Sequence, residues 1–173
     1  MKGLAHLYYG NGKGKTTAAV GLAVRAAGQK MHVIFAQFFK TMPTGEITEL
    51  EKLGITVLRA ELPAGFTWSM TEEELAVIRT EHDQLLKKAF SLVPADERTL
   101  LVLDEAVDAF AHGYLDKNAA LACFCSRPEK TELVLTGHCA PDEIVSICDY
   151  ITEMKACRHP YENGITARKG IEF

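Results

Sequence analysis

The chain has 173 residues, of which 47% are apolar and 24% are charged, and its formal net charge is -4. This length suits one domain of ordinary size, and the composition excludes an intrinsically disordered chain, a collagen-like repeat and a disulfide-stapled miniprotein. The negative charge argues against a dedicated nucleic-acid-binding protein, which usually presents a basic face. It does not exclude a nucleotide as ligand, because a few local donors are enough to hold phosphates.

The cysteines and the N-terminus predict where the protein works. The five cysteines are odd in number and form no CxxC pair, which indicates neither a disulfide framework nor a zinc site. Cys123 and Cys125 fall in an apolar run, and we expect buried, reduced thiols on a core helix. The first residues lead directly into a strand pattern without a signal peptide, and no run approaches the ~20 apolar residues of a membrane span. We therefore expect a cytoplasmic protein that does not enter a membrane.

Apolar patterning predicts strands and helices that alternate along the chain. In chain order we predict strand 4–8, helix 16–27, strand 32–38, helix 45–53, strand 56–58, helix 71–92, strand 99–103, helix 118–124, strand 132–136, helix 141–148 and strand 150–154. Gly28 and Gly54 are predicted helix stops, and Thr71 with Glu74 forms a predicted capping box. The alternation implies one α/β domain over residues 1–173, with a mostly parallel sheet and helices on both faces. In such sheets, ligands bind beyond the carboxyl ends of the strands.

The strongest functional signal lies between the first strand and the first helix, the context that a phosphate-binding loop requires. We call this segment the phosphate loop; it consists of Gly10, Asn11, Gly12, Lys13, Gly14, Lys15, Thr16 and Thr17. Glycines let backbone N–H groups point at phosphate oxygens, Lys15 adds a positive charge, and the Thr16 hydroxyl is placed to bind Mg²⁺. The usual pattern has glycine where this chain has Tyr9. The alternative, a glycine-rich turn with incidental lysines, is disfavoured by the strand–loop–helix context.

A second signal is the acidic pair Asp104 and Glu105, which follows the apolar strand 99–103. Phosphate-loop proteins hold their metal ion, or its water ligands, at such a strand end. Two acids at a strand end are sometimes only solvated, so the pair alone is weak evidence. Together with a phosphate loop it favours a metal-binding role.

Three other features have more than one interpretation. Phe66 and Trp68 either plug a minor core or form the wall of a site for a large flat ligand. Gly137, after the fifth strand, permits close approach of backbone to a ligand, and His138 beside it is a ligand, a phosphate donor or an ordinary surface residue. Lys40 is similarly placed after the second strand and is equally ambiguous.

In this combination and order, the motifs resemble those of the cob(I)alamin (corrinoid) adenosyltransferases of the phosphate-loop type. The resemblance is carried by GNGKGKTTAA at 10–19, Arg25, QFFK at 37–40, GE at 45–46, FTW at 66–68, LDE at 103–105, RP at 127–128, TG at 136–137, ITEM at 151–154, RHPYENGI at 158–165 and ARKGIEF at 167–173. It implies a RecA-like phosphate-loop NTPase fold and a homodimer. It also implies transfer of the 5′-deoxyadenosyl group of ATP to Co(I) of a reduced corrinoid, with release of triphosphate. The missing first glycine is itself a feature of the family.

The resemblance also implies roles for individual residues. The phosphate loop, with Lys15 as its catalytic lysine, would hold the triphosphate with help from Arg25. His138 stands where many members have an arginine, and we include it among the nucleotide-binding residues. Thr16 and Glu105, with Asp104 as a second candidate, would contact Mg²⁺ (or Mn²⁺). Phe66 and Trp68 would pack against the corrinoid and displace its lower axial ligand. An electron donor such as a reduced flavoprotein would reduce the cobalt.

Two alternative functions use the same loop. A phosphate-loop small-molecule kinase would release ADP, but neither a catalytic base nor lid arginines can be assigned in this sequence. A non-enzymatic nucleotide-dependent switch would release ADP and phosphate when its partner binds.

Overall fold

The structure is a computed structural model that describes residues 2–40, 44–62 and 70–172. Its strands are β1 (Ala5–Tyr9), β2 (His32–Gln37), β3 (Thr56–Arg59), β4 (Thr99–Asp104), β5 (Thr131–Gly137) and β6 (Tyr150–Glu153). Its helices are α1 (Lys15–Gly28), α2 (Gly45–Lys52), α3 (Glu72–Ser91), α4 (Ala106–Ala111), α5 (Lys117–Ser126) and α6 (Asp142–Val145), followed by a 3₁₀ turn, η2 (Pro160–Asn163).

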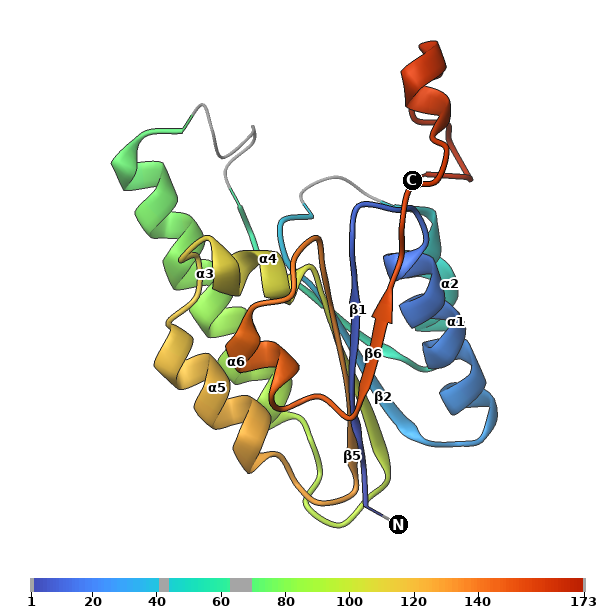
Figure 1. Cartoon of the computed structure of the whole chain (residues 1–173). Coiled ribbons are helices and arrows are strands. Elements are labelled where there is room, and N and C mark those ends of the chain that lie inside the picture. The colour runs from blue at the N-terminus through green and yellow to red at the C-terminus, as the bar shows by residue number, and fades with distance from the viewer. Residues whose placement is uncertain (1, 41–43, 63–69, 173) are drawn as a thin grey trace.

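The six strands form one sheet in the order β3-β2-β4-β5-β1-β6, and every pairing is parallel. Helices α1 and α2 cover one face, and α3 to α6 cover the other (Figure 1). This confirms the predicted α/β fold. Strand β5 lies between β1 and β4, so the strand before the phosphate loop and the strand before the acidic pair are not neighbours.

The alternation of side chains along β4 explains how the acidic pair reaches the phosphate loop. Leu100 and Val102 belong to the core under α1 and α2, whereas Leu101 and Leu103 belong to the core under α3 to α6. Successive side chains of a strand point to opposite faces, so Asp104 continues the α1 side. Small side chains on α1, with Ala19, Ala23 and Ala26 buried, allow that helix to pack closely on the sheet.

Most predicted elements are present, and the capping box of α3 forms as predicted from Thr71 and Glu74. The helices end near both predicted stops, α1 at Gly28 itself and α2 two residues before Gly54. The residues with a positive φ after these helices are Lys30 and Gly54. The predicted helix 141–148 is reduced to α6, for which Pro141 is the N-cap. Helix α4 was not predicted from the sequence, because six residues are too few to show a helical period.

The expectation for the cysteines needs a correction. The cysteines are free, but the prediction of buried thiols is wrong, because Cys123 is only part-buried and Cys125 is exposed at the surface of α5. Among the described residues, the structure contains no helix long and apolar enough to cross a membrane.

Gly137 owes its importance to packing between β5 and α4. A Cβ at this position would lie 2.6 Å from Val107 Cβ and 3.1 Å from the Asp108 amide nitrogen. The close approach is thus to α4, whereas the sequence led us to expect a ligand there.

We predict that Gly137→Ala destabilises the protein by about 1–3 kcal/mol, because β5 and α4 must move apart to admit the methyl group. Urea denaturation measures the change. Gly21→Ala is the matched control, since a Cβ at Gly21 meets nothing within 4 Å, and it should be neutral or stabilising by up to about 1 kcal/mol. Equal stability of Gly137→Ala and the unmodified protein would contradict this account of the β5–α4 contact.

Candidate active site

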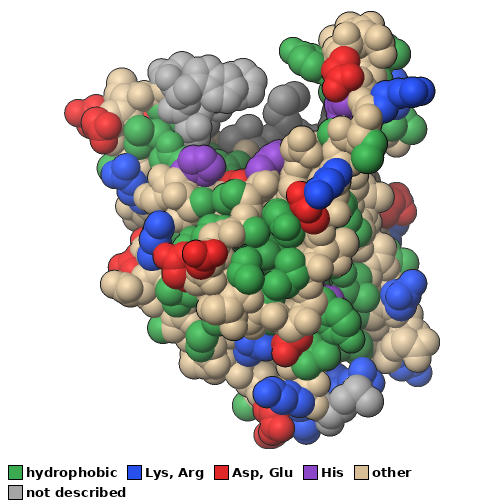
Figure 2. Space-filling view, viewed as in Figure 1, with side chains coloured by type: hydrophobic (Ala, Val, Ile, Leu, Met, Phe, Trp, Pro, Cys, Tyr) green, Lys and Arg blue, Asp and Glu red, His purple; other side chains and the backbone are tan. Residues whose placement is uncertain are grey.

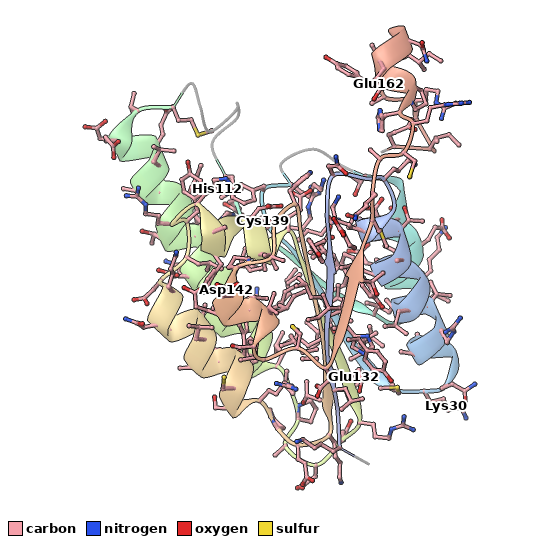
Figure 3. All side chains as sticks on the ribbon, viewed as in Figure 1. Lys30, His112, Glu132, Cys139, Asp142 and Glu162 are labelled. Carbon is pink, nitrogen blue, oxygen red and sulfur yellow. The ribbon has the colours of Figure 1, made fainter. Side chains whose placement is uncertain are left out.

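The candidate site lies at the carboxyl edge of the sheet, where the phosphate loop follows β1, Glu105 follows β4 and His138 follows β5. Figure 3 shows both ends of β5: Cys139, which follows the strand, lies toward the upper edge, and Glu132, near its start, lies toward the opposite end. His112, which follows α4, also lies toward the upper edge. In the space-filling view, the C-terminal segment projects above this upper edge (Figure 2).

The phosphate loop is shaped by its glycines and by the segment that follows β6. Gly10 and Gly14 have φ angles of 112° and 118°, which side-chain-bearing residues rarely adopt. A Cβ at Gly10 would collide with the carbonyl oxygen of Met154, and one at Gly12 would lie 2.7 Å from the carbonyl carbon of Lys155. The Gly12 amide donates to the Met154 carbonyl at 2.7 Å, so the chain after β6 holds the loop in place.

The same loop has a positive electrostatic potential at its centre. Gly14 is the N-cap residue of α1 and has no side chain to cap the helix, so the first-turn N–H groups face the loop, where an anion would bind. Lys15 Nζ donates to the carbonyls of Gly10 at 2.6 Å and of Gly12 at 2.9 Å, which places the ammonium inside the loop. Burial lowers the pKa of Lys15, and nearby carboxylates, Asp108 first among them, partly oppose this shift.

Asp104 links the phosphate loop to the acidic strand end. It is fully buried, accepts a hydrogen bond from the Thr16 hydroxyl at 2.9 Å, and accepts another from the Thr136 hydroxyl at 2.8 Å. Thr136 in turn accepts from the Glu105 amide at 2.8 Å. Burial, and then the charge of Glu105, raise the pKa of Asp104 to about 6. A buried carboxylate in such surroundings gains from a cation at its free lone pairs.

These groups fit a magnesium or manganese site. Carboxylate and hydroxyl oxygens are the donors that both ions prefer, and Mg²⁺ usually keeps several water or phosphate ligands of its own. Among the residues described, no cluster of three or more His, Cys, Asp or Glu could hold a metal ion by itself. An ion beside Thr16, Asp104 and Glu105 would therefore complete its shell with water and phosphate oxygens. Glu105 has a φ of 62°, a strained left-handed conformation that is typical of functional turns.

His138 lies beside the phosphate loop, and Asp108 fixes it there. Its backbone N–H donates to Asp108 Oδ1 at 2.9 Å, and its ring Nδ1 lies 2.9 Å from Asp108 Oδ2. The hydrogen bond to this largely buried carboxylate raises the pKa of His138. His138 lines a hollow of about 190 Å³ together with Lys15, Thr16 and Glu105. The side chain is thus positioned to donate to an anion in the loop.

Other predicted residues lie farther from this cluster or serve the loop itself. Arg25 is in the last turn of α1, ten residues after Lys15, which is about 15 Å along the helix axis from the start of the helix. The Asn11 side chain accepts from the Ala156 amide at 3.0 Å, and Lys13 donates to the Ile171 carbonyl at 2.8 Å. Both contacts attach the C-terminal segment to the loop.

Phe66 and Trp68, the predicted corrinoid contacts, lie outside the described residues. Thr17 is exposed at the start of α1, on the wall of a cavity of about 400 Å³ that it shares with Thr16 and Lys40. This cavity opens between the phosphate loop and the N-terminus of α2.

Comparison with solved structures supports the fold. The EssC structure (ATPases 2 and 3) from Geobacillus thermodenitrificans superposes with a TM-score of 0.51 at 15% identity. The match covers 98% of this chain but 36% of that one, so the chain spans about a third of that protein's length. The similarity is one of fold, and it agrees with the phosphate-loop NTPase architecture derived above.

Sequence comparison decides the family. The family model described as "ATP:corrinoid adenosyltransferase BtuR/CobO/CobP" matches residues 1–173, the whole chain. The chain belongs to the ATP:corrinoid adenosyltransferase family. The corrinoid adenosyltransferase of Pseudomonas aeruginosa is 34% identical over 173 residues, which are 99% of this chain and 84% of that protein. Corrinoid adenosyltransferase CobA of Salmonella typhimurium is 31% identical over 179 residues, which are 99% of this chain and 86% of that protein.

Membership confirms the predicted family and makes the chain an adenosyltransferase, a transferase enzyme whose substrate class is the corrinoids. Neither alternative considered from the sequence, the small-molecule kinase or the nucleotide-dependent switch, is favoured by these matches.

Three residues that position the site of this adenosyltransferase were not predicted from the sequence. Asp108 lies on the unpredicted helix α4, three residues after Glu105, and only the fold brings it to His138. Thr136 was visible only as part of a Thr-Gly pair, although a hydroxyl at the end of a buried strand is a usable signal. His82 is buried in the middle of α3 and accepts from the Phe39 amide next to Lys40, but in the sequence it looks like any core histidine.

The raised pKa of His138 predicts a pH-dependent contribution to ATP binding. The His138 imidazole is fully protonated and positively charged at pH values well below its raised pKa, and it loses this charge as the pH rises through that pKa. We expect His138→Arg, which keeps the charge at every pH, to lower KM for ATP several-fold at pH 9 and much less at pH 6. Steady-state kinetics at both values measure this, with His112→Arg as a control for added charge at the same edge. A pH-independent effect, or none, would show that His138 does not contact the nucleotide.

Proposed function

We propose that this adenosyltransferase transfers the 5′-deoxyadenosyl group of ATP to Co(I) of a reduced corrinoid and releases inorganic triphosphate. The observation that carries the proposal is the Thr16–Asp104 hydrogen bond, which joins the phosphate loop to the acidic pair at a single site. A nucleotide whose triphosphate lies in the loop would place its phosphate oxygens beside the Thr16 hydroxyl and the carboxylates of the acidic pair. The second substrate, the corrinoid, is inferred from the family to which the chain belongs.

The reaction requires orientation and charge stabilisation more than proton transfer. The cobalt electron pair forms the bond to C5′, the C5′–O bond breaks, and its electron pair leaves with the triphosphate. No proton is removed, so no general base is needed. The protein must hold C5′ in line with the cobalt and stabilise the negative charge that grows on the departing oxygen.

The described residues divide these tasks. The loop amides and Lys15 would hold the triphosphate, and protonated His138 would add a further positive charge. Thr16, Glu105 and Asp104 would hold Mg²⁺ or Mn²⁺, which would neutralise part of the charge on the triphosphate oxygens. Asp108 would keep His138 turned toward the loop through its contacts with the His138 backbone N–H and ring Nδ1.

Other parts of the proposal rest on the family resemblance. Phe66 and Trp68 would pack against the corrinoid and displace its lower axial ligand, which makes Co(II) easier to reduce. A reduced flavoprotein or a similar donor would supply the electron. Residues 1–173 would act as one domain in a cytoplasmic homodimer, and Arg25 would contact the triphosphate if nucleotide binding or the second subunit brings it near.

The identity of the nucleotide product tests the proposal. With ATP, Mg²⁺ and chemically reduced cobalamin, we expect one triphosphate for each carbon–cobalt bond formed, and no ADP. Phosphorus NMR identifies the phosphate product, and the visible spectrum reports the new bond. The control reaction lacks cobalamin and should leave ATP intact. Stoichiometric ADP without a carbon–cobalt bond would contradict adenosyl transfer and revive the kinase alternative.

A further inference from the structure

Lys40 is a charged residue of the site that the mechanism above does not use. It follows β2, and its Nζ lies 2.7 Å from Glu105 Oε1. Both side chains are largely covered, with 32% of Lys40 and 23% of Glu105 exposed. Lys40 also lines the cavity of about 400 Å³ that reaches Thr16 and Thr17 of the phosphate loop. It therefore borders both the acidic pair and a cavity that reaches the phosphate loop.

The backbone before Lys40 is fixed by a buried histidine. Phe39 has a φ of 57°, and its N–H donates to Nε2 of His82, which is fully buried. The other ring nitrogen of His82 lies 3.2 Å from the Tyr114 carbonyl, which can only accept, so Nδ1 carries the hydrogen. The Phe39 ring packs edge-on against His82 and Tyr114, with centroids 4.6 and 5.7 Å apart. Lys40 is thus presented from an anchored turn.

Three carboxylates lie around Lys40. Glu105 is its ion-pair partner, Asp104 is hydrogen-bonded to Thr16, and Glu46 lines the same cavity. The Gln37 side-chain amide and the Thr44 hydroxyl both donate to Glu46 Oε1, at 3.0 and 2.8 Å, and hold that carboxylate in place. Lys40, after β2, faces all three of these carboxylates, and Lys15 faces Glu105 and Asp104. Carboxylates therefore outnumber lysines here, which suits a site that receives a divalent cation.

A divalent cation beside Thr16 and Glu105 would change the partner of Lys40. It would attract the Glu105 carboxylate and repel the ammonium, because two positive charges a few ångströms apart repel strongly in a partly buried site. The nearest place for the ammonium is the cavity it already lines, beside the phosphate loop. The oxygens of a bound polyphosphate would replace the carboxylate as its acceptors.

We propose that Lys40 is a further ligand of the polyphosphate. Glu105 holds the Lys40 ammonium in position until a divalent cation binds the Glu105 carboxylate. The inference rests on the proposed function, since it assigns Lys40 to the triphosphate of the same site. It predicts opposite effects of one substitution: removal of the ammonium frees Glu105 for the metal ion and deprives the polyphosphate of a ligand.

The test compares Lys40→Met, which keeps the apolar stem, with Lys40→Arg and with Lys52→Met. Lys52 is an exposed lysine on α2 that pairs with Glu49, so its substitution makes the same charge change outside the site. Electron paramagnetic resonance measures Mn²⁺ affinity without nucleotide, and calorimetry measures the affinity for inorganic triphosphate in Mg²⁺. Thermal unfolding confirms that each variant is folded.

For Lys40→Met we expect Mn²⁺ to bind about twofold to fivefold tighter and triphosphate to bind about tenfold weaker. Lys40→Arg should retain most of the triphosphate affinity, and Lys52→Met should match the unmodified protein in both measurements. Unchanged triphosphate affinity in Lys40→Met, or weaker Mn²⁺ binding, would overturn the proposal. Failure of the unmodified protein to bind triphosphate would contradict the proposed function itself. A failure of the Lys40 proposal alone is therefore distinguishable, because the unmodified protein would then still bind triphosphate.

Discussion

A buried carboxylate holds the candidate site together. Asp104 is fully enclosed, and an enclosed carboxylate is tolerated only when hydrogen bonds or cations replace its lost hydration. Its partners come from α1, through Thr16, and from β5, through Thr136. One side chain therefore fixes the start of the phosphate loop's helix relative to the sheet. The same requirement explains why a divalent cation suits this position, because the cation would compensate charge that two hydroxyl groups only partly offset.

The rest of the edge is arranged around this group. The chain after β6 holds the phosphate loop from one side through the Met154 carbonyl. Gly137 lets α4 approach β5, and α4 carries Asp108 to His138. On the β2 side, His82 anchors the turn that presents Lys40 to Glu105. Lys15 and His138 thus lie at the phosphate loop and Lys40 lies beside Glu105, so positive groups stand at three strand ends. Such a distribution suits a leaving group that carries several negative charges.

Much of this arrangement is predictable, because it depends on local sequence. The phosphate loop needs glycine at Gly10 and Gly14, and parallel strands bring their carboxyl ends to one edge, so the sequence is enough to assign Lys15, Asp104 and Glu105 to the site. The period of two along β4 also places Asp104 on the side of α1. The fold class follows from the alternation of strands and helices, and the structure confirms it.

The remainder depends on contacts between distant segments, which local patterns do not report. Helix α4 is too short to show a period, and without it neither the partner of His138 nor the packing role of Gly137 could be inferred. The pairing of Lys40 with Glu105 requires the left-handed turn at Phe39, an unusual conformation for a phenylalanine. Cys125 was predicted to be buried because its neighbours are apolar, but α5 is amphipathic only weakly and turns this residue outward.

The central claim is that the hydroxyl of Thr136 and the carboxylate of Asp104 organise the metal and nucleotide site, and one pair of variants tests it directly. Thr136→Val keeps the shape of the side chain but removes the donor to Asp104 and the acceptor for the Glu105 amide, whereas Thr136→Ser keeps both. Electron paramagnetic resonance titration with Mn²⁺ and ATP should show affinity for the metal–nucleotide complex about tenfold to 100-fold lower in the valine variant, and close to normal in the serine variant. Equal, undiminished binding by the valine variant would contradict the account, because it would show that the site forms without this hydrogen-bond network.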